Sequence, residues 1–269
     1  MKLTISNIAW TDADDEAMLS LLPSLGVNAV ELAPTRIWAE WEFAESDVSA
    51  YRKFLQTKGL ACSSLQAIVY KKPDLKVFGS AAERAGLVAH LKRVADLAAL
   101  LGAKPLVFGA PKNRDRGDLD DKTAFAQAAD LFAEVGDYCQ QQGVCLCIEP
   151  NPVDYGCNFV TDSQGGAQLV RSVNSPGFRL HLDAAGMHLA GEDIPHALSS
   201  TIDVLEHVHI SEPNLGNFSA PQVAHEQVAA TLRSLDWNKW ISIEMRASDD
   251  AIANVKQAIA LVKEIYEVA

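Results

Sequence analysis

Four residues in the second half of the chain combine reactive side chains with a regular spacing. Glu149 ends the apolar run VCLCIE, Asp183 ends RLHLD, His209 lies in HVHIS, and Glu244 ends ISIE. A carboxylate is costly to bury unless its charge is compensated. A single acidic residue at the end of a strand could cap a helix or pair with a surface cation. Four such positions, at intervals of 34, 26 and 35 residues, indicate a shared purpose.

A divalent cation explains this set best. Three carboxylates crowded together would repel one another, and a bound cation removes that repulsion. The set is rich in oxygen donors and has no thiolate, so Mn²⁺ or Mg²⁺ suits it better than structural zinc, with Co²⁺ or Zn²⁺ as alternatives. We therefore predict that Glu149, Asp183, His209 and Glu244 bind one metal ion.

The same residues suit proton abstraction beside a carbonyl group. A cation that holds adjacent oxygens of a hydroxy-ketone stabilises the charge that develops as the proton leaves. Glu149 and Glu244 are the predicted catalytic residues, because each carboxylate could take or return a proton. Two bases on opposite faces would serve an epimerase, one face would serve an aldose–ketose isomerase, and a base with an acid would serve a dehydratase. The four residues alone do not choose among these reactions.

The elements that would position these residues recur along the chain. Short apolar segments alternate with helical patterns whose apolar residues recur at steps of three and four. The predicted strands are Leu3–Ile8, Ala29–Leu32, Cys62–Val69, Pro105–Gly109, Val144–Glu149, Phe178–Asp183, Leu205–Ile210 and Trp240–Met245. The clearest predicted helices are Ala81–Leu101, Lys122–Gln142, Gln222–Leu235 and Asp250–Val268.

Eight such units predict an α/β fold of the (β/α)₈ TIM-barrel type, which needs about 250 residues. The chain has 269 residues and an even composition, so we expect residues 1–269 to form one domain. A doubly wound open sheet is the alternative, but the first strand is followed by SNIAWTDADDE rather than a glycine-rich phosphate loop. In a barrel, reactive residues lie at the carboxyl ends of the strands. That location matches the four residues above.

The motifs CIEPN, HLDAAG, HVHISE and ISIEM resemble those of the xylose isomerase-like TIM-barrel superfamily. This group includes sugar phosphate isomerases and epimerases, D-tagatose 3-epimerase, hydroxypyruvate isomerase, keto-inositol dehydratase and apurinic endonucleases. The resemblance implies that the four residues bind one divalent metal and that the two glutamates also move protons. It also implies a small carbohydrate substrate. The chain differs from ketose 3-epimerases at two positions, where Gly186 replaces a histidine and Leu215 replaces an arginine.

Further residues are weaker candidates for contact with the substrate, each with a plain structural alternative such as a solvated loop or a surface helix. They are Lys112, Arg114, His188, Asn214, His225 and Arg246. Because Gly186 and Leu215 remove polar groups, we expect a substrate with an anionic or bulky group, held by Lys112, Arg114 and Arg246. Glu31 and Gln66 could face the barrel mouth or act as caps. His181 and His207 are expected to be core histidines below the metal, with their hydrogen bonds satisfied.

Composition excludes several classes of function. The formal charge of −12 and the lack of a long basic run disfavour nucleic acid as a partner, and with it an apurinic endonuclease. No apolar run of about 18 residues is found, and MKLTISNIAW lacks the long apolar core of a signal peptide, so we expect no membrane partner and a cytoplasmic location. The five cysteines are expected to be reduced. A homo-oligomer and a non-catalytic sugar-binding barrel remain open.

Overall fold

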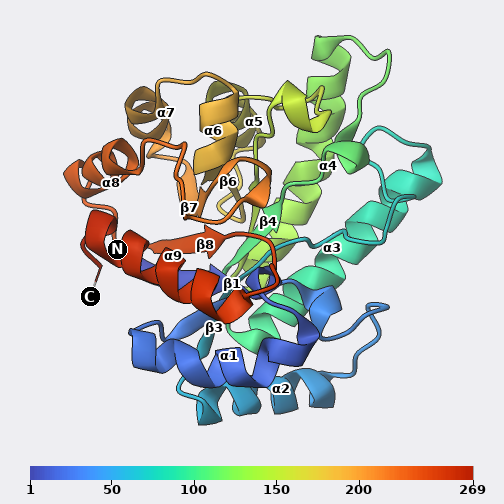
Figure 1. Cartoon of the computed structure of the whole chain (residues 1–269). Coiled ribbons are helices and arrows are strands. Elements are labelled where there is room, and N and C mark those ends of the chain that lie inside the picture. Colours follow the sequence, from blue (N-terminus) through green and yellow to red (C-terminus); the bar gives the residue numbers. More distant parts are fainter. Residues whose placement is uncertain (269) are drawn as a thin grey trace.

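The computed structural model describes residues 1–268. Within them, eight parallel strands pair in sequence order and close into a barrel, with helices packed around the outside (Figure 1). This confirms the predicted (β/α)₈ fold. The strands are β1 (Lys2–Ser6), β2 (Ala29–Leu32), β3 (Ala61–Leu65), β4 (Pro105–Phe108), β5 (Cys145–Ile148), β6 (Phe178–Asp183), β7 (Leu205–Ser211) and β8 (Trp240–Glu244).

The outer layer consists of helices that follow the strands and pack apolar faces on them. The helices are α1 (Asp15–Leu21), α2 (Glu45–Thr57), α3 (Ala81–Leu101), α4 (Asp121–Gln141), α5 (Ser163–Val173), α6 (Ala184–Leu189), α7 (Ile194–Thr201), α8 (His225–Ser234) and α9 (Ala251–Tyr266). Their buried faces and the strands form one hydrophobic core. Within residues 1–268, none of the helices combines the length and apolar character that a membrane crossing requires.

Parallel strands in a barrel are covered on the outside by helices and on the inside by opposing side chains, so their sequences read as nearly continuous apolar runs. β5 is the clearest case, because all four of its residues are buried. The cysteines there are reduced, as expected: Cys145 and Cys147 are both free thiols. The strand ends then mark the change from the apolar wall to the polar barrel mouth.

Several predicted boundaries are wrong by a few residues. The first strand ends earlier than expected, at Ser6, because the 3₁₀ turn Asn7–Ala9 follows it directly. The third ends earlier too, at Leu65, because Ala67 adopts a left-handed conformation with φ of 53°. The helix predicted from Gln222 begins at His225, since the amides of Gln222 and Val223 instead donate hydrogen bonds to the side chain of Glu212. That carboxylate ties the loop after β7 to the start of α8.

Candidate active site

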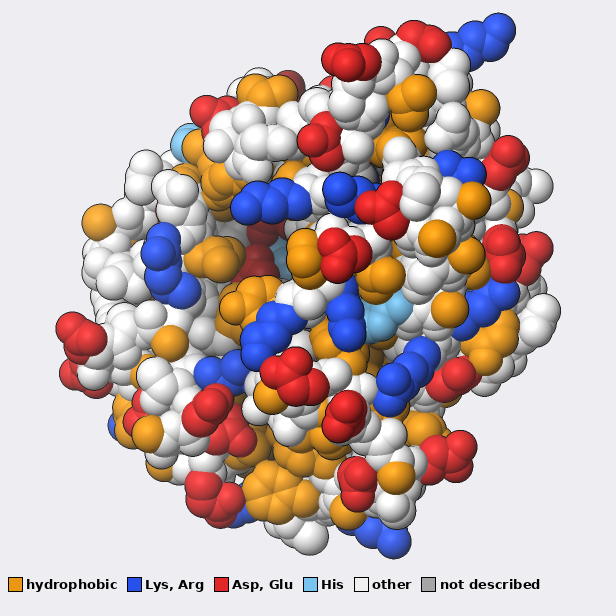
Figure 2. Space-filling view, turned by 90° about the vertical axis from the view of Figure 1, so that its right-hand side faces the viewer, with side chains coloured by type: hydrophobic (Ala, Val, Ile, Leu, Met, Phe, Trp, Pro, Cys, Tyr) orange, Lys and Arg blue, Asp and Glu red, His pale blue; other side chains and the backbone are white. Residues whose placement is uncertain are grey.

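A large cavity opens at the carboxyl ends of the strands. Its volume is about 1010 Å³, and it is lined mainly by the loops that follow β3, β4, β5, β7 and β8. Such a volume lies at the upper end of the range for small-molecule sites. Figure 2 looks at this side of the molecule and shows a hollow with acidic side chains in its floor and basic side chains around its rim.

The four predicted metal ligands come together in the floor of this cavity. Glu149, Asp183 and Glu244 line it, and His209 lies just beneath with 1% of its surface exposed. Donor atoms of Glu149, Asp183 and His209 lie within 4.8 Å of one another. On the other side, His209 Nδ1 lies 3.2 Å from Glu244 Oε2. Strand register explains this closeness, because Asp183 pairs with His209 and Ser211 pairs with Glu244.

The carboxylates in the cavity floor raise one another's pKa values. Burial raises the pKa of Glu149 to about 8, and repulsion from Asp183 and Glu244 adds to the effect. Burial and the charge of Glu244 likewise raise the pKa of Asp183 to about 6. His209 Nδ1 is buried and makes no aligned hydrogen bond, although it faces this acidic group. Glu149, Asp183 and His209 thus form a compact donor set with Glu244 beside His209, and such a set of carboxylates with one imidazole fits a divalent cation.

Asp183 is held in place by two neighbours. The backbone N–H of Gly186 donates to its Oδ1 at 2.6 Å, and the Ser211 hydroxyl donates to its Oδ2. Asp183 thus caps α6 with one oxygen while its carboxylate remains in the cavity floor. Gly186, the position where ketose 3-epimerases carry histidine, is part of this cap and does not line the cavity.

Arg114 does not overhang the mouth, so the prediction that it contacts the substrate is not supported. Its side chain is fully buried beneath the site. The guanidinium donates to the carbonyl oxygens of Phe108, Glu149 and Phe159 at 3.2, 2.7 and 3.0 Å, and to Asn151 Oδ1 at 2.8 Å. These hydrogen bonds connect the carboxyl ends of β4 and β5 and fix the backbone of Glu149.

The two candidate histidines also lie outside the cavity wall. His188 is exposed on α6 and does not line the cavity. His225 is buried, with Nε2 at 2.7 Å from Glu212 Oε1 and Nδ1 at 2.9 Å from the Tyr266 hydroxyl. It can affect the site only through Glu212, which does line the cavity.

The remaining candidates are at the rim. Lys112, Asn214 and Arg246 all line the cavity. Asn214 and Leu215 both adopt left-handed backbone conformations, with φ of 58° and 55°. The Arg246 side chain donates to the Asn214 carbonyl, and its backbone N–H donates to the Leu215 carbonyl at 3.0 Å. Arg246 therefore holds this strained loop as well as facing the cavity.

Some residues that line the cavity are not predicted from the sequence. Glu212 follows β7 directly, so the rule that strand ends carry the chemistry could have found it. Lys71 and Lys72 line the wall formed by the loop after β3, and nothing in their spacing marked them. Gln66 lines the cavity, as one of its two readings predicted. Glu31 was expected at the mouth or in a cap, yet it is fully buried inside the barrel below His209.

Comparison with known proteins places the chain in a family. The family model of the xylose isomerase-like TIM barrel matches residues 19–265. The chain belongs to this family. Among curated proteins, no sequence matches the chain.

Solved structures share the fold of this family member. D-psicose 3-epimerase from Clostridium cellulolyticum H10, with D-tagatose, has a TM-score of 0.84 at 14% identity over 100% of both chains. A 3-keto-D-glucoside 4-epimerase from E. coli has a TM-score of 0.82 at 14% identity, over 98% of this chain and 99% of the other. A family 2 AP endonuclease from Brucella melitensis has a TM-score of 0.79 at 14% identity, over 98% and 99%. At these identities the likeness establishes the fold.

Proposed function

We propose that this protein is a divalent-metal-dependent isomerase or epimerase of a small sugar or sugar derivative. The observation that carries the proposal is the convergence of Glu149, Asp183, His209 and Glu244 in the cavity floor, with raised pKa values for Glu149 and Asp183. The names of two solved structures with this fold, both sugar epimerases, are consistent with it.

The residues of the chain have separate tasks in this proposal. Glu149, Asp183, His209 and Glu244 would hold the cation, with Mn²⁺ or Mg²⁺ preferred. A bound cation would polarise the substrate carbonyl and stabilise negative charge on its oxygens. Glu149 directly follows β5 and Glu244 ends β8, three strands apart, so their carboxylates approach the cavity from different sides. One takes the proton from the carbon beside the carbonyl, and the other can return a proton to the opposite face.

Burial also supports a role in proton transfer. A general base works best when its pKa lies near the working pH. Without a bound cation, the surroundings of Glu149 raise its pKa to about 8, and a cation bound to the carboxylate would lower the pKa again, toward the ionised form that a base needs.

Incubation with Mn²⁺ in D₂O tests the proposal. Candidate substrates are D-fructose, D-psicose, D-tagatose and their phosphorylated and acidic derivatives. An isomerase or epimerase gives an isomeric product that carries deuterium at the carbon beside the carbonyl. A product lighter by one water would instead identify a dehydratase that uses the same carboxylates. Binding without turnover or deuterium exchange across the panel would favour a sugar-binding barrel.

Metal content supplies the second arm of the test. Elemental analysis of protein dialysed against Mn²⁺ should give about one ion per chain, and Asp183→Asn should lose it. Asp183 is the ligand chosen for substitution because it has no assigned proton-transfer role, so the variant tests metal binding alone. A wild-type protein that retains no divalent ion would contradict the metal-dependent part of the proposal.

A further inference from the structure

Below the cavity floor, Glu31 is a buried carboxylate that the proposed chemistry does not use. It lies on β2 and has no exposed surface. Its Oε1 accepts from His209 Nε2 at 2.8 Å and from Ser242 Oγ at 2.9 Å. Its Oε2 accepts from His207 Nε2 at 2.8 Å and from Ser64 Oγ at 2.6 Å. A carboxylate offers about four acceptor positions, so these four donors use its full capacity.

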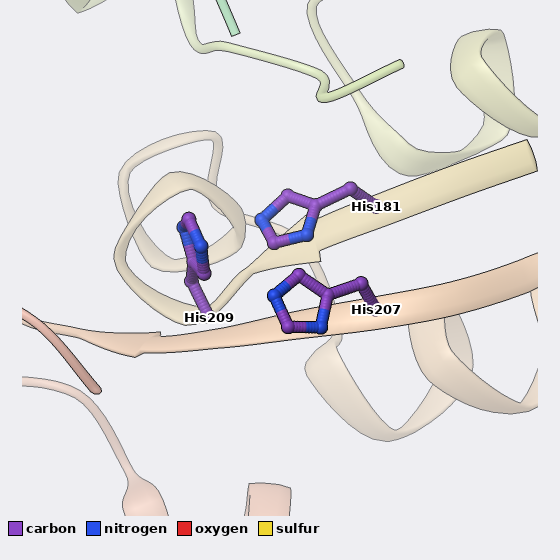
Figure 3. Close-up of side chains that lie close together, drawn as sticks. All are labelled: His181, His207 and His209. Carbon is purple, nitrogen blue, oxygen red and sulfur yellow. The ribbon is translucent and has the colours of Figure 1, made fainter. Parts of the chain in front are cut away.

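The three histidines of this region could be mistaken for a second metal site. Donor atoms of His181, His207 and His209 lie within 4.8 Å of one another, and Figure 3 shows that they come from two neighbouring strands. However, Nε2 of His207 and Nε2 of His209 are both occupied by Glu31. The ring of His181 lies against that of His209 edge to face, with centroids 4.1 Å apart and planes at 72°. Two of the three rings, those of His207 and His209, therefore hydrogen-bond to one carboxylate, whereas the buried ring nitrogens of His181 have no hydrogen-bond partner.

The bond to Glu31 decides which nitrogen of His209 is free. An ionised carboxylate can only accept, so His209 Nε2 must carry the hydrogen. In a neutral imidazole the other nitrogen, Nδ1, then presents its lone pair. Nδ1 is the atom that lies 3.2 Å from Glu244 Oε2. A ring with the opposite tautomer would point an N–H at the place where the cation belongs.

The geometry assigns Glu31 as a positioning residue: from the opposite side of the barrel it fixes the tautomer and ring orientation of His209, so that Nδ1 can bind the cation. This inference rests on the proposed metal site. β2 and β7 are not neighbours, since β1 and β8 separate them in the barrel. Glu31 therefore reaches His209 across the interior, and His181 packs on the ring from the other direction. A carboxylate that merely filled this space would be costly without such partners.

Metal titration of three variants tests the assignment. Glu31→Gln keeps the size of the side chain but brings an N–H₂ group among donors, and Glu31→Asp keeps the charge on a shorter stem. Removal of such a supporting partner typically lowers metal affinity about 10- to 100-fold. We expect this loss in Mn²⁺ affinity for Glu31→Gln by calorimetry, with partial recovery in Glu31→Asp.

Glu206→Gln is the third variant and the matched control. Glu206 is a buried carboxylate on β7 with two partners, Lys104 at 2.8 Å and Lys239 at 2.7 Å, and it does not line the cavity. Its loss should lower the melting temperature without changing Mn²⁺ affinity by more than about twofold. If Glu31→Gln and Glu206→Gln bind Mn²⁺ equally well, Glu31 has only a structural role and the inference is overturned.

Nitrogen-15 NMR of histidine-labelled wild type gives a readout that needs no variant. In the Mg²⁺- or Zn²⁺-loaded protein, the proton of His209 should reside on Nε2; a proton on Nδ1 would overturn the assignment.

The outcome of these tests of Glu31 is separable from that of the proposed function. Weakened Mn²⁺ binding in Glu31→Gln without any sugar turnover in wild type rejects the function alone. Sugar turnover with unchanged Mn²⁺ affinity in Glu31→Gln rejects the positioning role alone, and a wild type that binds no metal rejects the inference together with metal dependence.

Discussion

The backbone of Gly109 lies so close to the carboxylate of Glu149 that a Cβ atom at position 109 would overlap Oε2. Gly109 follows β4, which pairs with β5, so the glycine leaves the space into which the Glu149 side chain turns. The requirement is one of space, because Gly109 does not adopt a positive φ. The position of the Glu149 carboxylate, which we propose to be catalytic, thus depends on the absence of a side chain just after the neighbouring strand β4.

Gly109→Ala should therefore displace the Glu149 carboxylate and leave the barrel folded. We expect kcat to fall by about 10²-fold or more, since a displaced catalytic group of this kind can cost that much. The melting temperature should change little, because a side chain with a free end can move aside. Gly165→Ala is the control, since its new Cβ would make only an ordinary contact with Asp162. Full activity in Gly109→Ala would contradict this account of the site.

Removal of either proposed acid–base group should stop the chemistry. Glu149→Gln and Glu244→Gln keep side-chain volume but cannot exchange the proton, so kcat should fall by about 10²- to 10⁴-fold. Solvent-deuterium exchange into the substrate separates the roles, because the variant that lacks the abstracting base should lose exchange as well as turnover. Thermal melting should show folded protein in both cases. Retained activity in either variant would remove that residue from the catalytic pair.

The sequence was informative where a residue's position along its own strand determines its role. Glu149, Asp183, His209 and Glu244 could be found because parallel strands in a barrel carry their last residues to one mouth. Arg114 was misplaced because a charged loop residue looks solvated until its four acceptors are known. Those acceptors belong to β4, to Glu149 and to the following loop. Glu31 was misplaced for a similar reason, since its partners come from strands that are distant in sequence.

Arg114→Ala should act on stability and not on substrate affinity alone. The substitution leaves three carbonyl oxygens and the Asn151 side chain without a buried donor, and hydrogen bonds from charged groups contribute about 1.5–3 kcal/mol each. We expect a loss of about 3 kcal/mol or more in the free energy of unfolding, measured by urea denaturation. Lys112→Ala is the control. The side chain of Lys112 is exposed, two residues from Arg114, so its removal should leave the free energy of unfolding unchanged. A raised KM for Arg114→Ala with unchanged stability would contradict the structural role.

The raised pKa of Glu149 predicts opposite effects of pH with and without metal. Between the ordinary value of 4.5 and about 8, the folded protein holds a proton on Glu149 that the unfolded chain has released. Because stability falls with pH where the folded state binds more protons, the EDTA-treated protein should become less stable from about pH 5 to pH 8. Mn²⁺ requires ionised carboxylates, so its stabilising effect should grow over the same range.

Melting temperatures with EDTA and with excess Mn²⁺, recorded across this pH range, measure both trends. Asp183, whose pKa is raised to about 6, contributes in the same direction at the lower end of the range. Glu149→Gln is the control, since it removes one titrating group and should make the fall in the EDTA curve shallower than in wild type. The remaining slope comes from His209, whose pKa Glu31 and Glu244 hold well above its ordinary value against the opposing effect of burial. A melting temperature that rises with pH in EDTA would contradict the raised pKa of Glu149.

The last prediction concerns the far wall of the cavity, where basic side chains surround the acidic floor (Figure 2). Lys72 and Lys112 line this wall from the loops after β3 and β4. The buried Asn113, in the loop after β4, connects it to the loop after β3. Its side chain donates hydrogen bonds to the carbonyl oxygens of Lys72 and Leu75 at 2.8 and 2.6 Å. The two lysines are therefore held on neighbouring segments, although the protein as a whole is strongly acidic.

This arrangement supports a substrate whose anionic group lies away from the reacting carbons. Lysine is a compact point charge that suits phosphoryl oxygens, and the cavity of about 1010 Å³ has room for more than a free ketose. Lys72→Ala and Lys112→Ala should each raise KM for a phosphorylated ketose about 3- to 10-fold with little change in kcat, because they contribute uniform binding. Lys76→Ala, in the same loop but outside the cavity, is the matched control. Efficient turnover of neutral D-fructose or D-psicose, with KM values that none of the three substitutions changes, would show that the basic wall does not hold the substrate.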